Sequence, residues 1–173
     1  MSSELILFCG AAVAFRVTML VVSLRHEAVL KREGAVEIGA RNTAILALAH
    51  IAFYISAMTE GGFRAHPMDA AFMIGAGLYT IGAVALVVVI RLLGPLWTVK
   101  LLIARKHVLV THPLFRWVRH PNYFLNILPE LIGFALLLNA PLTLAVGLPI
   151  YAIPLIIRIR QEEAAMKTRF PAY

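Results

Sequence analysis

Long apolar segments constrain the fold of this 173-residue chain more than any other feature. Three of them cover residues 5–24, 42–59 and 70–90, and a longer apolar region covers residues 124–157. The last region is interrupted by Asn139, Ala140 and Pro141, which favour a turn. Because a bilayer core about 30 Å thick is crossed by roughly 20 apolar residues in a helix, we predict three transmembrane helices followed by a helical hairpin.

The composition agrees with this prediction, because 61% of the residues are apolar and only 14% are charged, whereas soluble domains carry about 25% charged residues. The first hairpin arm, residues 124–138, would span only about 22 Å at 1.5 Å per residue. It would be longer if the helix began at Pro121, since proline is favoured in the first turn; a re-entrant arm is the alternative. We therefore predict an all-α integral membrane protein with about five transmembrane helices, forming a single membrane domain over residues 1–173.

The charges predict an orientation. Sixteen Lys and Arg residues against nine Asp and Glu give a net charge of +7. All but two of the basic residues lie in the two connections between helices one and two and between helices three and four, or after the last helix. Only Arg64 falls on the other side, and Arg16 lies within a helix. By the positive-inside rule, the N-terminus is expected outside and the C-terminus in the cytoplasm, in a bacterial inner membrane. Membrane lipids, and not nucleic acid, are therefore the expected partners of the positive charge.

Two polar segments could carry chemistry. Residues 91–123 are rich in His, Trp, Arg and Pro, although a connection between helices needs only about two to eight residues. The second segment follows the last apolar run and contains Arg158, Glu162 and Glu163. On a helix, Arg158 and Glu162 share one face. They could form an ordinary exposed ion pair worth about 0.3–0.5 kcal/mol, or they could hold an acidic substrate and accept a proton.

Together these segments resemble the isoprenylcysteine carboxyl methyltransferase family of integral membrane enzymes, which use S-adenosylmethionine and are related to phospholipid methyltransferases. The resemblance covers residues 91–166. It depends on Leu93-Gly94 with Trp97-Thr98, on residues 107–110, on Arg119-His120-Pro121-Asn122-Tyr123, and on Arg158 with Glu162-Glu163. Where family members usually have Gly-Pro-Tyr-Arg, this chain has His112-Pro113-Leu114-Phe115-Arg116. The residues after Asn122 look more like the bacterial branch.

The resemblance implies that S-adenosylmethionine binds between the long polar segment and the C-terminal helix, on the cytoplasmic side. Residues 91–173 would form the methyltransferase-like part, after three N-terminal transmembrane helices in residues 1–90. The implied cofactor-binding residues are His107, Leu109, Val110, His120, Pro121, Tyr123 and Glu163. The implied catalytic residues are Arg158 and Glu162. We expect no metal site.

Methyl transfer from a sulfonium requires mainly alignment of the nucleophile and exclusion of water. Arg158 could orient a carboxylate acceptor through two hydrogen bonds, and Glu162 could accept the proton of a hydroxyl or phenol. Both acceptor classes therefore stay open. Candidate acceptors are a lipid, an isoprenoid or polyketide acid or phenol, and a prenylated cysteine carboxylate, each entering laterally from the bilayer.

Ionisable residues inside the bilayer are functional hypotheses by default. Arg16 could extend its head group toward the surface or pair with Glu130, and Glu130 could instead meet a substrate head group. His50, with Tyr54 four residues later on the same helical face, could line a substrate cavity or simply pack. Two other functions remain open: a small multidrug-type transporter that uses Glu130, and a nicotinamide-dependent membrane reductase.

Overall fold

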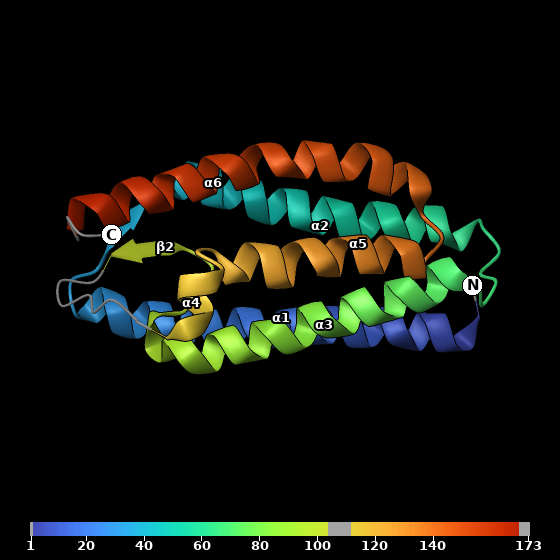
Figure 1. Ribbon diagram of the computed structural model, residues 1–173, viewed down its shortest axis with the longest axis horizontal. Helices are drawn as coiled ribbons and strands as arrows, with labels where there is room; N and C mark the ends of the chain where they lie inside the picture. The colour runs from blue at the N-terminus through green and yellow to red at the C-terminus, as the bar shows by residue number, and fades with distance from the viewer. Residues whose placement is uncertain (1, 104–111, 170–173) are drawn as a thin grey trace.

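The computed structural model describes residues 2–103 and 112–169, most of them in helices. Four helical segments are long and apolar enough to cross a membrane. They are α1 (Ser3–Arg32), α2 (Ala40–Gly62), α3 (Ala70–Leu93) and α6 (Leu148–Arg169), the last continuing from the π-helical segment η3 (Thr143–Gly147). Figure 1 shows these helices side by side along the long axis of the molecule. The chain is a multi-pass integral membrane protein.

The hairpin that the sequence predicts is present. Its first arm begins at Pro121 and consists of the π-helical segment η2 (Asn122–Ile127) and α5 (Leu128–Leu137). The turn follows at Asn139, whose φ of 48° lies in the left-handed region that Asn tolerates better than most residues. The first arm is shorter than the four long helices, so a complete fifth crossing stays a prediction.

Both π-helical segments precede a proline by two residues. Segment η2 ends at Ile127 before Pro129, and η3 ends at Gly147 before Pro149. Proline has no backbone N–H to donate and its ring clashes with the preceding turn, and a helix absorbs such a defect by widening locally. The widened turn of η2 lies at the start of the first hairpin arm and includes Tyr123.

The described residues are mostly helical, as predicted, and they also contain one small two-stranded sheet. Strand β1 (Val36–Ile38) pairs antiparallel with β2 (Leu101–Ile103), with Glu37 opposite Leu102. Each strand has three residues, too few to show a strand period in the sequence, and the partners are far apart along the chain. This small sheet ties the connection between α1 and α2 to the long polar segment.

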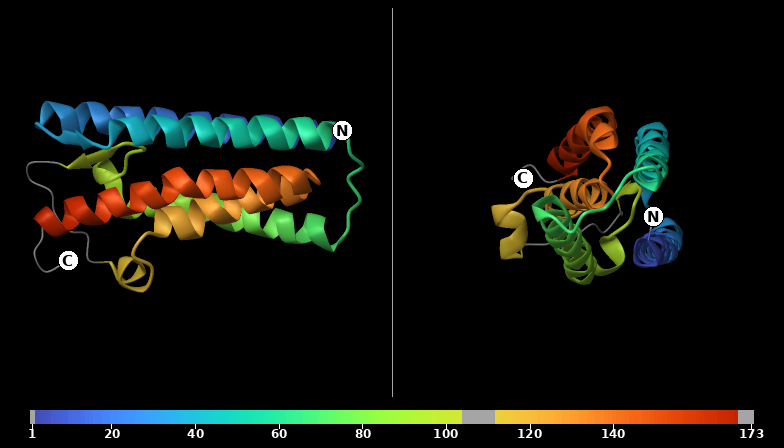
Figure 2. Two further views of the ribbon diagram at one scale, coloured as in Figure 1. Left: turned by 90° about the horizontal axis from the view of Figure 1, so that it is seen from above. Right: turned by 90° about the vertical axis from the view of Figure 1, so that its right-hand side faces the viewer.

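Helix α5 forms the centre of the bundle, with α2, α3 and α6 around it (Figure 2). Its residues Leu131 and Phe134 are completely buried. Helix α3 approaches it closely because glycines lie at the contact: a Cβ atom on Gly133 would lie 2.4 Å from the backbone nitrogen of Tyr79, and one on Gly75 would lie 2.8 Å from that of Leu137. Small residues allow such close packing in membranes.

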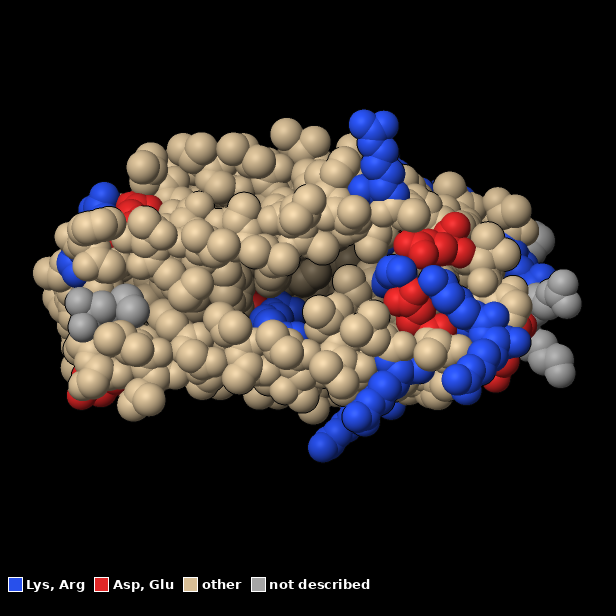
Figure 3. Space-filling view, turned by 180° about the vertical axis from the view of Figure 1, so that it is seen from behind, with Lys and Arg blue, Asp and Glu red and all other residues tan. Residues whose placement is uncertain are grey.

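Helix α1 begins at the end of the bundle opposite to the end where α6 finishes (Figure 1). Figure 3 shows one face of the molecule, on which a broad uncharged band is followed at one end by many Lys, Arg, Asp and Glu side chains. The 3₁₀ turn η1 (Gly94–Leu96) and the short helix α4 (Pro113–Trp117) also belong to the polar segment between α3 and η2. This segment forms much of the site described next.

Candidate active site

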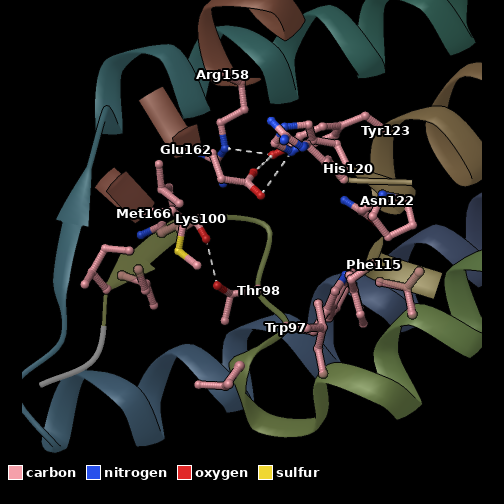
Figure 4. Close-up of a pocket in the computed structure, with 18 of the residues that line it drawn as sticks. Trp97, Thr98, Lys100, Phe115, His120, Asn122, Tyr123, Arg158, Glu162 and Met166 are labelled. Atoms are coloured by element: carbon pink, nitrogen blue, oxygen red, sulfur yellow. Dashed lines mark hydrogen bonds and ion pairs between the residues drawn. The ribbon is translucent and has the colours of Figure 1, made fainter. Parts of the chain in front are cut away.

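A pocket of about 510 Å³ lies between the long polar segment and α6 (Figure 4). Its volume is within the range of about 300–1,000 Å³ that is usual for small-molecule sites. The wall is apolar on the α3 side and polar where η2 and α6 face each other. The polar and aromatic residues of its wall include Trp97, Thr98, Lys100, Phe115, Arg116, Arg119, His120, Asn122, Tyr123, Arg158 and Glu162.

Arg158 is held rigidly in this wall although it emerges from an apolar helix. It is only 4% exposed. Its Nη1 donates to Thr43 Oγ1 on α2 at 2.7 Å, its Nη2 donates to the carbonyl oxygen of Val99 at 2.9 Å, and its Nε donates to the Tyr123 hydroxyl at 3.3 Å. Three separate parts of the chain therefore fix one guanidinium, as preorganised binding of an anion requires.

Glu162 is joined to Arg158 through Tyr123. The Tyr123 hydroxyl donates to Glu162 Oε2 at 2.5 Å and accepts the hydrogen bond from Arg158 Nε, and Figure 4 shows these side chains converging. Within the described residues, no direct ion pair joins Arg158 and Glu162. The expectation of an ordinary exposed pair is therefore wrong, because this face of α6 packs against α2 and η2 and Arg158 is drawn to partners there.

His120 lies between two carboxylates. Its Nδ1 is 3.4 Å from Glu162 Oε1, and its Nε2 is 3.3 Å from Glu163 Oε1. Burial alone would lower the pKa of His120, but the hydrogen bonds and charges of Glu162 and Glu163 outweigh burial and raise the pKa above its ordinary value. The charged imidazolium is therefore favoured here, and it partly neutralises the acidic side of the pocket.

The structure brings most of the predicted site residues together. His120, Pro121, Tyr123, Arg158 and Glu162 all contribute to the pocket wall. Glu163 contacts His120 from outside the wall. His107, Leu109 and Val110 lie outside the described residues, so their predicted roles stay predictions.

Sequence reasoning missed the contribution of α1. Three residues on one face of its C-terminal part bind the segment Trp97–Lys100. His26 Nδ1 bonds the Trp97 carbonyl oxygen at 2.8 Å, Ser23 Oγ accepts from the Val99 backbone N–H at 2.8 Å, and Glu27 Oε1 accepts from Lys100 Nζ at 2.7 Å. The available signal was the placement of Ser23, His26 and Glu27 at the i, i+3, i+4 spacing that puts side chains on one helical face.

The residues inside the bilayer also form a cluster. Arg16 pairs with Glu130, which confirms the predicted ion pair. The Tyr54 hydroxyl donates a hydrogen bond to the same carboxylate. His50 stacks on Tyr54 and lies 3.9 Å from Glu130 Oε1. Since Glu130 is completely buried, this pairing removes the cost of an isolated charge in hydrocarbon.

The pocket residues fit S-adenosylmethionine, a cation with an aromatic base. Trp97 Nε1 is buried, and it has no hydrogen-bond partner among the described residues. Such groups are costly unless a ligand or water satisfies them. The aromatic rings of Trp97 and Phe115 offer surfaces for a base, and the Glu162 carboxylate complements a positive charge.

The membrane helices define a multi-pass integral membrane protein, and it has a polar pocket at one end. Residues 74–168 match the isoprenylcysteine carboxyl methyltransferase family, and the chain belongs to this family, a family of methyltransferases. Among its relatives are an uncharacterized protein of Haemophilus influenzae and the uncharacterized protein YpbQ of Bacillus subtilis. The first is 44% identical over 91% of this chain and 92% of the relative, and the second is 29% identical over 88% and 90%. No solved structure matches the chain significantly.

Proposed function

We propose that this protein transfers a methyl group from S-adenosylmethionine to a carboxylate or hydroxyl of a lipophilic acceptor at the cytoplasmic face of a membrane. The observation that carries the proposal is the buried Arg158, linked through the Tyr123 hydroxyl to Glu162 in the wall of one pocket. Family membership supports the reaction class. The basic connections favour a cytoplasmic pocket and an N-terminus on the outside, in a bacterial inner membrane.

The cofactor, when bound, supplies a methyl group activated by the positive sulfur. His120, Pro121 and Tyr123 shape its pocket, Glu163 supports His120, and the residues His107, Leu109 and Val110 complete the proposed nucleoside site. No metal takes part in this proposal, because the sulfonium already carries the activating charge.

Arg158 serves to orient the acceptor. A guanidinium has five N–H donors, and Thr43, Val99 and Tyr123 take one hydrogen bond each. The two donors left over can bind a carboxylate acceptor and direct its oxygen toward the methyl group. Because the guanidinium is already fixed, little reorganisation is needed when the acceptor arrives.

Glu162 serves as the proton acceptor when the acceptor is a hydroxyl or phenol. Glu162 would take the proton of the acceptor hydroxyl, directly or through the Tyr123 hydroxyl, whose bond to Glu162 is 2.5 Å. The acceptor oxygen would bond to the methyl carbon as the methyl–sulfur bond breaks, and the neutral thioether would leave. A carboxylate acceptor brings no proton and would need only Arg158. The two variants below therefore separate the acceptor classes.

The test is methyl transfer from labelled S-adenosylmethionine into lipids extracted from membranes that contain or lack the protein, followed by identification of the labelled lipid. Arg158→Ala should abolish the transfer, and Glu162→Ala should abolish it only for a hydroxyl acceptor. Arg160→Ala is the matched control, because Arg160 is exposed on the same helix. Unchanged transfer in both variants, or no saturable binding of the cofactor to the purified protein by calorimetry, would refute the proposal.

A further inference from the structure

The inner faces of α1 and α2 are covered at both ends but not in the middle. On α1, Ala12 and Ser23 are buried, whereas the inward residues between them, including Arg16 and Met19, are only half-buried. On α2, Thr43 and Phe53 are buried, whereas Leu46, Ala49 and His50 are half-buried. Arg16 and His50 both lie beside Glu130, so the two half-covered stretches lie at the same depth in the bundle.

These stretches border an opening toward the lipid. Helices α1 and α2 form the face of the molecule that is turned away in Figure 1 (Figure 2). Figure 3 shows that face, with a hollow near its middle and charged side chains in it, inside an otherwise uncharged band. Arg16 and Glu130 are the ion pair at this depth. The side chain of Arg16 is 21% exposed, and that of His50 is 19% exposed.

Exposing an edge of the Arg16 guanidinium to hydrocarbon costs free energy, and a polar group bound in the hollow would lower that cost. His50 points to the same conclusion. Its Nε2 is buried, and it has no hydrogen-bond partner in the described part of the chain. The ion pair is already neutral overall, so a second carboxylate would leave an unbalanced charge in a medium of low dielectric constant. The group that fits best is an uncharged oxygen, which can accept from Arg16 and bond to His50.

Helix α6 runs past both the hollow and the active site. Tyr151, which contacts His50, and Arg158 are both on α6. They are seven residues apart, or about 10 Å along a helix. The cytoplasmic end of the half-covered region is Ser23 on α1 and Thr43 on α2, and Thr43 bonds Arg158 directly. A second polar route joins the two places, since Arg16 contacts Asn126, Asn126 bonds Asn122, and Asn122 lines the pocket.

We propose that the hollow between α1 and α2 is the binding site of the acceptor molecule, and that Arg16 and His50 bind an uncharged hydroxyl or carbonyl oxygen about 10 Å from the atom that is methylated. This inference rests on the proposed function and specifies its substrate class: a lipophilic acid or alcohol with a second oxygen group within its hydrophobic part.

The test compares two probes, stearate and 10-hydroxystearate, competing for labelled stearate on the purified protein in detergent. The hydroxyl of the second probe can reach Arg16 and His50 when the carboxylate binds Arg158. One added hydrogen bond should make 10-hydroxystearate bind about fivefold more tightly to the wild type. Partition into the micelle affects wild type and variants alike, so the ratio of the two affinities in each protein is the quantity to compare.

Two variants remove the preference by different routes. His50→Phe keeps a ring stacked on Tyr54 but removes the ring nitrogens, and Tyr151→Phe is its control for the lost bond between His50 and Tyr151. Removing Arg16 alone would leave Glu130 unpaired and could prevent folding, so the second variant is the double substitution Arg16→Met with Glu130→Leu. We expect both variants to bind the two probes equally, and Tyr151→Phe to keep the fivefold preference.

Equal binding of the probes to the wild type, no binding of either, or a preference that survives both variants would overturn the inference. Calorimetric binding of S-adenosylhomocysteine to the same preparations distinguishes this result from failure of the proposed function. If the cofactor product binds and the probe preference is absent, only the acceptor site is wrong. If the cofactor product does not bind, the proposed function itself fails.

Discussion

Ser23 on α1 offers a sharp test of how the active site is held, although it lies outside the matched family region. Its Oγ accepts a hydrogen bond of 2.8 Å from the backbone N–H of Val99, and the carbonyl oxygen of the same residue accepts from Arg158 Nη2 at 2.9 Å. Ser23 is 2% exposed. In Ser23→Ala, the Val99 N–H loses its partner in a place where water cannot replace it.

The expected size of the effect follows from that loss. A buried donor left without a partner costs about 1–3 kcal/mol, and the segment can lower this cost only by moving, which also moves the carbonyl that fixes Arg158. If about 1–2 kcal/mol of that appears in the transition state, kcat falls about 5–30-fold. The KM for the cofactor should rise as well, because Trp97, Thr98 and Lys100 line the pocket and move with the segment.

The assay is steady-state methyl transfer to the acceptor that the labelling experiment identifies, together with thermal unfolding of the purified protein. Thr18→Val is the matched control, because Thr18 is exposed on the same helix and its hydroxyl bonds only its own helix at Ala14. Ser23→Cys retains a weak acceptor and should recover part of kcat. A wild-type kcat in Ser23→Ala, or an equal loss in Thr18→Val, would show that α1 does not position Arg158.

Three further predictions concern other parts of the bundle. Tyr123→Phe removes the hydroxyl between Arg158 and Glu162. Measured as initial rates, its kcat should be about 10–100-fold lower for a hydroxyl acceptor. Wild-type rates in this variant would exclude a linking role for Tyr123. Gly133→Ala places a methyl group 2.4 Å from the Tyr79 nitrogen, and it should lower the free energy of unfolding by at least about 1–3 kcal/mol in a thermal melt. The control is Gly77→Ala, whose methyl group meets open space and should leave the stability unchanged. Because the folded pKa of His120 is raised, its stabilisation is complete below the unfolded pKa of about 6.5 and is lost as the pH rises through the folded value. The melting temperature of wild type minus that of His120→Gln should therefore decrease from pH 5.5 to pH 8.5, and a constant difference would contradict the placement of His120 between two carboxylates.

Much of the helical architecture could be predicted from the sequence because hydrophobic length is a local property. The apolar stretch 70–90 becomes α3 (Ala70–Leu93), and the turn at Asn139 separates the hairpin arms as expected. The first helix is longer than predicted, because α1 continues to Arg32. Its charged last turns lie beyond the apolar stretch, so hydropathy could not detect them. They nevertheless bind Lys100 in the pocket wall through Glu27, and Leu30 packs against Leu102 of β2.

The site residues could be predicted where they belong to one short sequence motif, as His120, Pro121 and Tyr123 do. It was not predictable where a partner comes from a distant helix. Nothing in the local sequence of Thr43 indicates that its hydroxyl accepts a bond from Arg158, and the i, i+4 spacing of Arg158 and Glu162 favoured a direct pair that the described structure does not contain. Helix spacing shows which side chains share a face, but the neighbouring helices determine which groups they bind.

Helix α5 and the turn before it connect the two polar places in the bundle. The first arm of the hairpin carries Tyr123 at the active site and Glu130 at the mid-membrane cluster, and Gly133 locks its next turn against α3. A shift of this arm along α3 would move Tyr123 and Glu130 together, and the glycine contact leaves no room for such a shift. Because Arg158 bonds Tyr123 and Arg16 pairs with Glu130, this rigid arm helps to fix the distance between the methyl-transfer site and the proposed oxygen site. If the acceptor site is real, acceptors whose second oxygen lies nearer or farther along the chain should bind less tightly, because the protein cannot adjust this spacing.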